Sequence, residues 1–502
     1  NFEGQDETVS LSQILEPIFA FFADSNLKSN LMSPGLIPNL KGLSTLLSNK
    51  TIAQKFTESP LFLPTERLRE GKDVKESLLG RILAVSLLED TVLQTEFFLD
   101  PMNTSAAEVH NNIFSLRETL KVYWDNLAKI FMCLFESGVA GRDAALEWLA
   151  LVSKLNGDRR KTYFDRDIVV GDGFILNLLA VMLKVCAPFA LPTSPKLEKI
   201  DPTYVLSEAR VNYSDATRLG VAAGSLERVE SESSPGPHAA YRHVISLEPT
   251  DLVDENQAPL PRTPNVEEVI EVSSKFGFIT EAFYLTGSLL ELGYSSTYSL
   301  YGDTLMRINE LKKQMDRVES MGAGVSTFPG FREVMLKKLE KERLEEVRRK
   351  LCYDVYLMGT DQFGPDLICF AASSSSYLLR LLCFGNPPEL PLSVPPGMKA
   401  AVQLEAMVDD VVNIMINSLR YDPDAVDRSA PMIDNILTLS VVAINSPLHF
   451  KNPYLRSRLA ELLWLMAPRT SERDGMRRNT ACQAAFEAHP FLKKYLMRAI
   501  FR

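Results

Sequence analysis

The sequence is poor in the side chains that bind transition metals or form disulfides. Its 502 residues include five histidines and six cysteines, and no two cysteines form a C-x-x-C pair. None of the histidines stands with cysteines or carboxylates at the spacing of zinc ligands, which argues against a structural zinc site. The cysteine usage fits a reducing compartment better than a secreted disulfide framework. The histidines are His110, His238, His243, His449 and His489.

Long apolar runs and an excess of positive charge are also lacking. The most apolar run, Phe174 to Ala187, is shorter than the roughly 20 residues of a membrane helix and contains Asn177 and Lys184, so it predicts a buried core helix and no membrane partner. The 54 Lys+Arg against 64 Asp+Glu give a net charge of -10, which predicts no nucleic-acid partner. The chain begins at Asn1 without a basic or apolar leader, so we expect a fragment with no export signal.

Apolar residues recur with the period of an α-helix along most of the chain. Between residues 120 and 136 they follow the i, i+3, i+4, i+7 spacing of one wide apolar face, and Gly138 offers a stop. The pattern then predicts a helix that begins after Asp143 and ends at residues 156–157, where Asn and Gly favour a helix end. These two segments therefore predict a helical hairpin.

The same hairpin pattern returns in the C-terminal part of the chain. An apolar stripe over 404–419 is broken at Asp422-Pro423, and a partner helix is predicted over 432–444. Asn452 followed by Pro453 predicts another helix start, because proline lacks the N–H that would have no partner there. A longer helix, rich in charges at i, i+4, is predicted from residue 331 to about 358.

Helical hairpins with short turns, unequal lengths and no dominant period predict an all-α fold, an irregular armadillo- or HEAT-like helical solenoid, with a compact bundle as the alternative. Between residues 220 and 265 the helical period stops and Ser, Glu and Pro abound, which predicts a disordered loop. The expected organisation is an N-terminal helical part over 1–119, central hairpins over 120–219, the loop over 220–265, a block with the long helix over 266–385, and C-terminal hairpins over 398–502 where the core is incomplete.

Few polar groups are placed in a way that predicts catalysis. Cys133, Cys186, Cys369 and Cys383 lie in apolar helical stretches, where burial is expected to raise the thiol pKa and leave the side chain inert. Cys352 follows two arginines and a lysine and is the thiol best placed to react, although packing is the favoured role there too. We therefore assign no catalytic residue, no cofactor or cofactor-binding residue and no metal ligand.

Four other features of the sequence could take part in binding a ligand or partner. Neither Gly171-Asp172-Gly173 nor Gly322-Ala323-Gly324 follows a predicted strand or completes a phosphate-binding loop, so turn and capping roles are favoured. The triplet Arg159-Arg160-Lys161 could bind phosphate or an acidic partner, but a solvated helix end is favoured. Asn177 lies among apolar residues, so we expect its amide to be buried and to fasten a helix crossing.

Several strings along the chain resemble a known family. They are Asn156 to Arg160, Asp172 to Leu178, Cys186 to Phe189, Lys196 to Tyr204, Thr217 to Leu219, Phe278 to Thr286, Ser446-Pro447 and Lys451 to Arg456. In order and spacing they resemble the core of ubiquitin chain elongation factors, the U-box ubiquitin ligases that extend chains on already modified substrates. The resemblance covers about residues 120 to 490, and residues 1 to 119 match only vaguely.

The resemblance implies an armadillo-like core that positions substrate, ubiquitin chain and a ubiquitin-selective AAA ATPase relative to a C-terminal U-box. The U-box of the family recruits the charged ubiquitin-conjugating enzyme without forming a covalent intermediate of its own. The chain stops at Arg502, before the place where a U-box is expected, so we expect this fragment to be inactive alone and its parent to be a ubiquitin transferase of the cytoplasm and nucleus.

Two other functions stay open at the level of sequence. One is a non-enzymatic helical-repeat adaptor that binds peptides or partner helices, which the recovery of partners other than ubiquitin and the ATPase would favour. The other is covalent cysteine catalysis, which would require loss of activity on Cys352→Ala or another single thiol change. The leading hypothesis is a scaffold that contributes proximity and orientation more than acid–base chemistry.

Overall fold

The computed structural model describes residues 11–27, 30–161, 163–207, 210–213, 216–219, 226–229, 242–247, 266–273, 275–320, 330–358, 363–383, 389–392, 398–447, 449–468 and 480–500. The chain folds into two compact units, each built from two stretches of sequence. Unit 1 comprises residues 1–185 and 289–359, and unit 2 comprises residues 186–288 and 360–502. The predicted blocks 120–219 and 266–385 are thus each divided between the two units.

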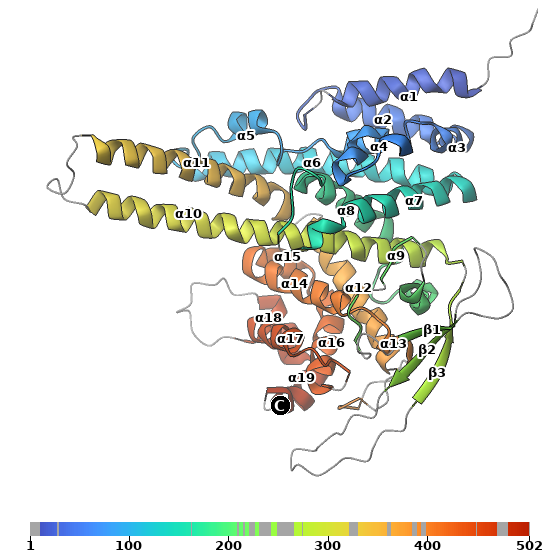
Figure 1. The fold of residues 1–502 in the computed structure, drawn as a ribbon. Helices are drawn as coiled ribbons and strands as arrows, with labels where there is room; N and C mark the ends of the chain where they lie inside the picture. The colour runs from blue at the N-terminus through green and yellow to red at the C-terminus, as the bar shows by residue number, and fades with distance from the viewer. Residues whose placement is uncertain are drawn as a thin grey trace, which may run out of the picture. The chain divides into compact units, whose positions relative to one another are not determined.

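The described residues of unit 1 form helices, three of which are long, with 31, 25 and 27 residues. Its elements are α1 (Leu11–Leu27), α2 (Leu36–Leu47), α3 (Lys50–Glu58), η1 (Thr65–Arg67), η2 (Gly71–Glu76), α4 (Leu78–Leu83), α5 (Thr91–Phe97), α6 (Ala106–Glu136), α7 (Val139–Leu155), η3 (Gly157–Arg160), α8 (Asp172–Cys186), the π-helix η6 (Leu290–Ser295), α10 (Ser296–Ser320) and α11 (Phe331–Leu357). The spine is α6, which packs against α2, α3, α7 and α11. Helices α10 and α11 lie side by side as a long hairpin (Figure 1).

Unit 2 contains the remaining helices. They are η4 (Pro195–Lys199), η5 (Pro202–Leu206), α9 (Phe278–Leu289), α12 (Phe363–Cys383), α13 (Met398–Ala401), α14 (Glu405–Tyr421), α15 (Pro423–Arg428), η7 (Ala430–Met432), α16 (Ile433–Asn445), α17 (Pro453–Met466), α18 (Thr480–Ala488) and α19 (Pro490–Ile500). Helix α12 is long and apolar enough to cross a membrane by length and composition alone, but it packs against α14 and α16 and is mostly buried within unit 2. It is therefore a core helix of this unit.

Unit 2 also contains three short strands. Strands β1 (Leu226–Val229), β2 (Arg242–Leu247) and β3 (Val266–Glu271) form an antiparallel sheet in the order β1-β2-β3 (Figure 1). Leu226 pairs with Ile245, and Arg242 pairs with Glu271. The segment 220–265, for which we predicted a disordered loop, thus contains β1 and β2, and its other residues lie outside the described ones. Strands this short, set among Ser and Pro, give too little alternation to be predicted.

The predicted helices agree well with the observed ones. The long helix expected over 331–358 is α11, and Asn452 caps α17 by accepting hydrogen bonds from the backbone N–H groups of Tyr454 and Leu455. One start was wrong: α7 begins at Val139, because Gly138 adopts a φ of 135° and turns the chain straight from α6 into α7. The predicted all-α class is confirmed, and the armadillo or HEAT type of repeat stays a prediction.

Candidate functional site

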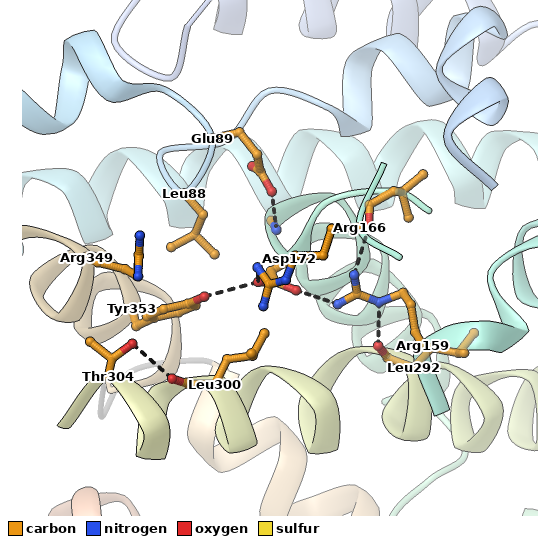
Figure 2. A network of polar contacts seen from close by, with 12 residues as sticks. Leu88, Glu89, Arg159, Arg166, Asp172, Leu292, Leu300, Thr304, Arg349 and Tyr353 are labelled. Atoms are coloured by element: carbon orange, nitrogen blue, oxygen red, sulfur yellow. Dashed lines mark hydrogen bonds and ion pairs between the residues drawn. The ribbon is translucent and has the colours of Figure 1, made fainter. Parts of the chain in front are cut away.

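Unit 1 contains a polar cavity of about 650 Å³. Its wall is formed by the turn before α5, by the segment that leads from η3 into α8, and by the facing sides of α10 and α11. Figure 2 shows its polar cluster, in which Asp172 at the start of α8 lies between Tyr353 of α11 and Arg159 of η3. Segments that are far apart in the sequence therefore meet here through side-chain hydrogen bonds.

Arg159 holds three backbone segments together from a buried position. Its side chain is 2% exposed, and its guanidinium donates from Nε to the carbonyl oxygen of Leu292 at 2.8 Å, and from Nη1 to that of Val170 at 2.8 Å. Nη2 binds Asp172 Oδ1 at 2.5 Å, and the Asp172 side chain is only 8% exposed. The guanidinium thus joins η3, the start of α8 and the π-helix η6, and its charge is balanced by a single carboxylate.

Asp172 and Glu89 both lie at the N-terminus of α8. Asp172 Oδ2 accepts a hydrogen bond from the Tyr353 hydroxyl at 3.1 Å, and Glu89 Oε1 accepts one from the backbone N–H of Gly173 at 3.0 Å. Both carboxyl groups lie at the positive end of the α8 dipole, which favours negative charge. Burial, and to a smaller extent the nearby charge of Asp172, raise the pKa of Glu89. Burial also raises the pKa of the Tyr353 phenol, with the charge of Asp172 as the next cause.

Glycines allow this close packing. A Cβ on Gly173 would come within 1.8 Å of Ser86 Oγ, and a Cβ on Gly171 within 2.1 Å of Glu89 Oε1. Gly171-Asp172-Gly173 lies at the start of α8, and its two glycines allow the close approach of residues 86–89. The other predicted glycine motif, Gly322-Ala323-Gly324, lies outside the described residues.

Asn177 is buried, as predicted, and fastens α8 to two neighbours. Its Nδ2 donates to the carbonyl oxygens of Leu83 at 2.9 Å and Val85 at 3.0 Å, and its Oδ1 accepts from Trp124 Nε1 at 2.8 Å. The side chain has no exposed surface. A single amide therefore ties α8 to α6 and to the turn that follows α4.

Two residues of the strings that carry the family resemblance in unit 2, the half-buried Arg218 and the buried Tyr284, bind several neighbouring segments. The Arg218 guanidinium donates to three carbonyl oxygens, those of Val402, Val205 and Tyr213, at 2.6–2.9 Å. Burial lowers the pKa of Arg218 to about 10. The Tyr284 hydroxyl of α9 meets Tyr377 of α12 at 2.9 Å and Gln403 at 3.0 Å. These groups connect segments of unit 2 that are distant in sequence.

Cys186 and Cys352 are buried, whereas Cys133, Cys369 and Cys383 are half-buried. Burial raises the pKa of Cys186, Cys352 and Cys482 to about 12 and that of Cys383 to about 11, and it also raises the pKa of Cys369. Cys352 borders the cavity, but Asp354 adds to the effect of burial on its pKa. A thiol with so high a pKa is a poor nucleophile at neutral pH, so the chemistry of the cavity rests on charged groups.

The expectation for the basic triplet was wrong at one of its three residues. Arg159 is buried and does not form part of a solvated helix end, whereas Arg160 pairs with Glu291 at 2.6 Å and Lys161 with Asp158 at 2.6 Å, both nearer the surface. Sequence reasoning also missed Glu89 and Tyr353. The sequence indicated the site only through the two glycines that flank Asp172. They suggest that another segment packs closely there, but they do not identify that segment.

No group of three or more His, Cys, Asp and Glu side chains that could hold a metal ion occurs among the described residues. His449 and His489 are buried in unit 2, where His489 Nε2 lies 3.1 Å from Thr438 Oγ1. The side chains of His238 and His243 lie outside the described part of the chain.

Comparison with known proteins assigns the family. The family model described as the ubiquitin elongating factor core matches residues 79–502. The chain is 24% identical over 507 residues to the "Probable ubiquitin conjugation factor E4" of Arabidopsis thaliana. The alignment covers 98% of this chain and 47% of that protein.

Two fungal proteins are similar at the same level. The "Ubiquitin conjugation factor E4" of Schizosaccharomyces pombe is 22% identical over 84% of this chain and 38% of its own length. The "E4 ubiquitin-protein ligase UFD2" of Saccharomyces cerevisiae is 22% identical over 82% of this chain and 41% of its own length. The chain spans less than half the length of these relatives. Since the family model covers most of its residues, the chain belongs to the ubiquitin elongating factor core family.

Proposed function

We propose that these 502 residues form the scaffold of a ubiquitin chain elongation factor, which holds a ubiquitylated substrate in place while a U-box outside this sequence promotes polyubiquitin extension. The match of residues 79–502 to the elongating factor core carries this proposal. The relatives that are similar along nearly the whole chain are named as ubiquitin conjugation factors or as a ubiquitin-protein ligase, which supports the same pathway.

The packing of each unit suits a positioning role. A scaffold accelerates a reaction by keeping reactants at a fixed distance and orientation, which requires that its own elements do not slide. In unit 1 the buried Arg159 and Asn177 side chains bind neighbouring segments at hydrogen-bond distance, and in unit 2 Arg218 does the same. Each unit is therefore cross-linked by buried or half-buried polar groups as well as by its apolar core.

The partners follow from the family. We propose that the scaffold binds ubiquitin or ubiquitylated substrate and a ubiquitin-selective AAA ATPase, and that the U-box recruits the ubiquitin-conjugating enzyme. Chain extension would then depend on the joint presence of scaffold and U-box in one molecule, because linkage raises the effective concentration of the second component.

A reconstituted chain-extension assay tests the proposal. The activating enzyme, a conjugating enzyme and a mono-ubiquitylated substrate are combined with this chain, with an isolated U-box from a relative, with both unlinked, or with both fused. We expect the fusion to extend chains faster than the U-box alone or the unlinked mixture, and this chain alone to give no extension. Extension by this chain alone, or a fusion no faster than the isolated U-box, contradicts the scaffold role.

A further inference from the structure

The cavity of unit 1 has spare hydrogen-bond donors at its mouth. Two of its four arginines use both Nη atoms in contacts within unit 1: Arg159 in the contacts described above, and Arg307 with Glu310 at 3.2 Å and Glu342 at 3.1 Å. Arg166 has no hydrogen bond within the described residues, because its contact with Asp172 is an ion pair at 3.9 Å. Arg349 uses only Nη1, which meets the Glu346 carboxylate at 2.9 and 3.0 Å. These two side chains are 57% and 56% exposed.

The acceptors of the cavity are largely occupied. Asp172 binds Arg159 and Tyr353, Glu346 binds Arg349, and Glu89 accepts the N–H of Gly173. Asp303 is exposed and is the one cavity carboxylate for which no partner is found among the described residues. Five N–H groups of Arg166 and the free edge of Arg349 therefore outnumber the spare acceptors.

Arg166 and Arg349 both lie near the Tyr353 hydroxyl. The positive charges of Arg166 and Arg349 each lower the pKa of Tyr353, against the stronger effects of burial and of Asp172, so both lie close enough to its hydroxyl to be felt there. Figure 2 shows Arg349 beside Tyr353 and Arg166 beside Asp172, with the Tyr353–Asp172 hydrogen bond between them. A carboxylate placed above this bond could meet both arginines.

We propose that the cavity binds an acidic peptide segment, with one Glu or Asp carboxylate held between Arg166 and Arg349. Its volume of about 650 Å³ lies within the size range of ligand pockets and leaves room for a short stretch of peptide. The spare carboxylate of Asp303 can accept a backbone N–H of that peptide. This inference does not depend on the proposed scaffold function.

A phosphate or nucleic acid fits this site less well. The N-terminus of α8, which would otherwise attract phosphate, is already occupied by the Glu89 carboxyl group. Asp303 and Glu346 line the same cavity and would repel a doubly charged phosphate more strongly than a singly charged carboxylate.

The test is fluorescence anisotropy on the whole chain with labelled nine-residue peptides. One peptide alternates Glu and Ala, and two others carry Gln or Lys in place of Glu. We expect the Glu peptide to bind at least about tenfold more tightly than the Gln peptide, and Arg166→Ala or Arg349→Ala to weaken it by about tenfold each, since each removes a charge-assisted hydrogen bond.

Arg317→Ala is the matched control. Arg317 is an exposed arginine of α10 outside the cavity, so its removal changes the net charge equally and should leave binding unchanged within twofold. Thermal melting of each variant checks that the fold is retained. Equal binding of the Glu and Gln peptides, no binding of the Glu peptide, tighter binding of the Lys peptide or of a single-stranded oligonucleotide, or an equal loss in Arg317→Ala overturns the proposal.

Discussion

Replacing Arg159 by Met tests whether the buried guanidinium stabilises unit 1. Met has a similar length but no donor, so Asp172 loses its counter-ion while the carbonyl oxygens of Val170 and Leu292 lose a charged donor. Removal of one partner from a buried ion pair costs about 3–5 kcal/mol. The 2% and 8% exposure of the two side chains places this pair in that class. We therefore expect the free energy of unfolding of unit 1 to fall by about 4 kcal/mol.

Urea unfolding followed by tryptophan fluorescence can isolate this unit. Of the three tryptophans, Trp124 and Trp148 are buried in unit 1, and Trp464 belongs to unit 2. In a Trp464→Phe background the emission therefore reports on unit 1 alone. At a slope of about 2–3 kcal/mol per M urea, a loss of about 4 kcal/mol lowers the midpoint by about 1.3–2 M.

A double-mutant cycle with Asp172→Asn separates the ion pair from simple loss of packing. Each single change leaves one buried charge unpaired, whereas the double variant leaves none. We expect the double variant to be at least about 1 kcal/mol more stable than the sum of the single losses predicts. A loss below about 1 kcal/mol for Arg159→Met, or strictly additive losses, would show that water replaces the contacts and would refute the reasoning.

Four further changes follow from the same structure. Asn177→Leu removes the hydrogen bonds that this amide forms with two carbonyl oxygens and with the Trp124 indole N–H. Urea unfolding should therefore show a loss of about 3 kcal/mol or more, and a loss below about 1 kcal/mol contradicts the fastening role. Burial raises the pKa of Glu89 above its usual 4.5, so the folded state binds the proton of this carboxyl group more tightly than the unfolded state does. The stability of the wild type relative to Glu89→Gln should therefore fall as the pH rises above about 4.5. A stability difference that does not change with pH would refute this. Since burial raises the pKa of Cys186, Cys352 and Cys482 to about 12, iodoacetamide at pH 8 should alkylate them at least about a hundredfold more slowly in the folded than in the urea-unfolded protein, as peptide mass mapping would show; comparable rates would contradict their burial. Arg218→Met leaves three carbonyl oxygens of unit 2 without their donor and should increase hydrogen exchange at residues 402–405, with unchanged protection as the contrary result.

The helical elements could be predicted because each carries its own local pattern. The apolar stripe of α14 and the Asn-Pro start of α17 depend on neighbours within a few residues, so the sequence contains the necessary information. The burial of Asn177 could be predicted for the same reason, since its surroundings on α8 are uniformly apolar. The start of α7 was missed because the positive φ of Gly138 made a helix stop and a helix start coincide.

The cavity could not be predicted because its residues come together only in the tertiary fold. Glu89, Asp172 and Tyr353 lie in three separate segments, and Tyr353 and Asp172 are 181 positions apart. Arg159 looked like part of a basic surface run, because nothing local distinguishes it from Arg160. Its burial follows from the π-helix η6, whose Leu292 carbonyl accepts a hydrogen bond from Arg159 Nε. Such irregular turns have no strong sequence pattern, although they are frequent at functional sites.

The division of labour among the arginines links stability to binding in unit 1. All three nitrogens of Arg159 are hydrogen-bonded within unit 1 and its side chain is 2% exposed, so its contribution is to fix Asp172 and hence the Tyr353 hydroxyl. Arg166 and Arg349 have spare donors and high exposure, so their removal should cost little folding energy. A ligand carboxylate would then meet a preformed floor, and its binding would not have to reorganise the ion pair that holds η3, α8 and η6 together. Replacing Arg166 or Arg349 should consequently weaken peptide binding without changing the urea midpoint. The conservative Arg159→Lys should lower the urea midpoint, and it should weaken peptide binding only indirectly, through greater mobility of Asp172.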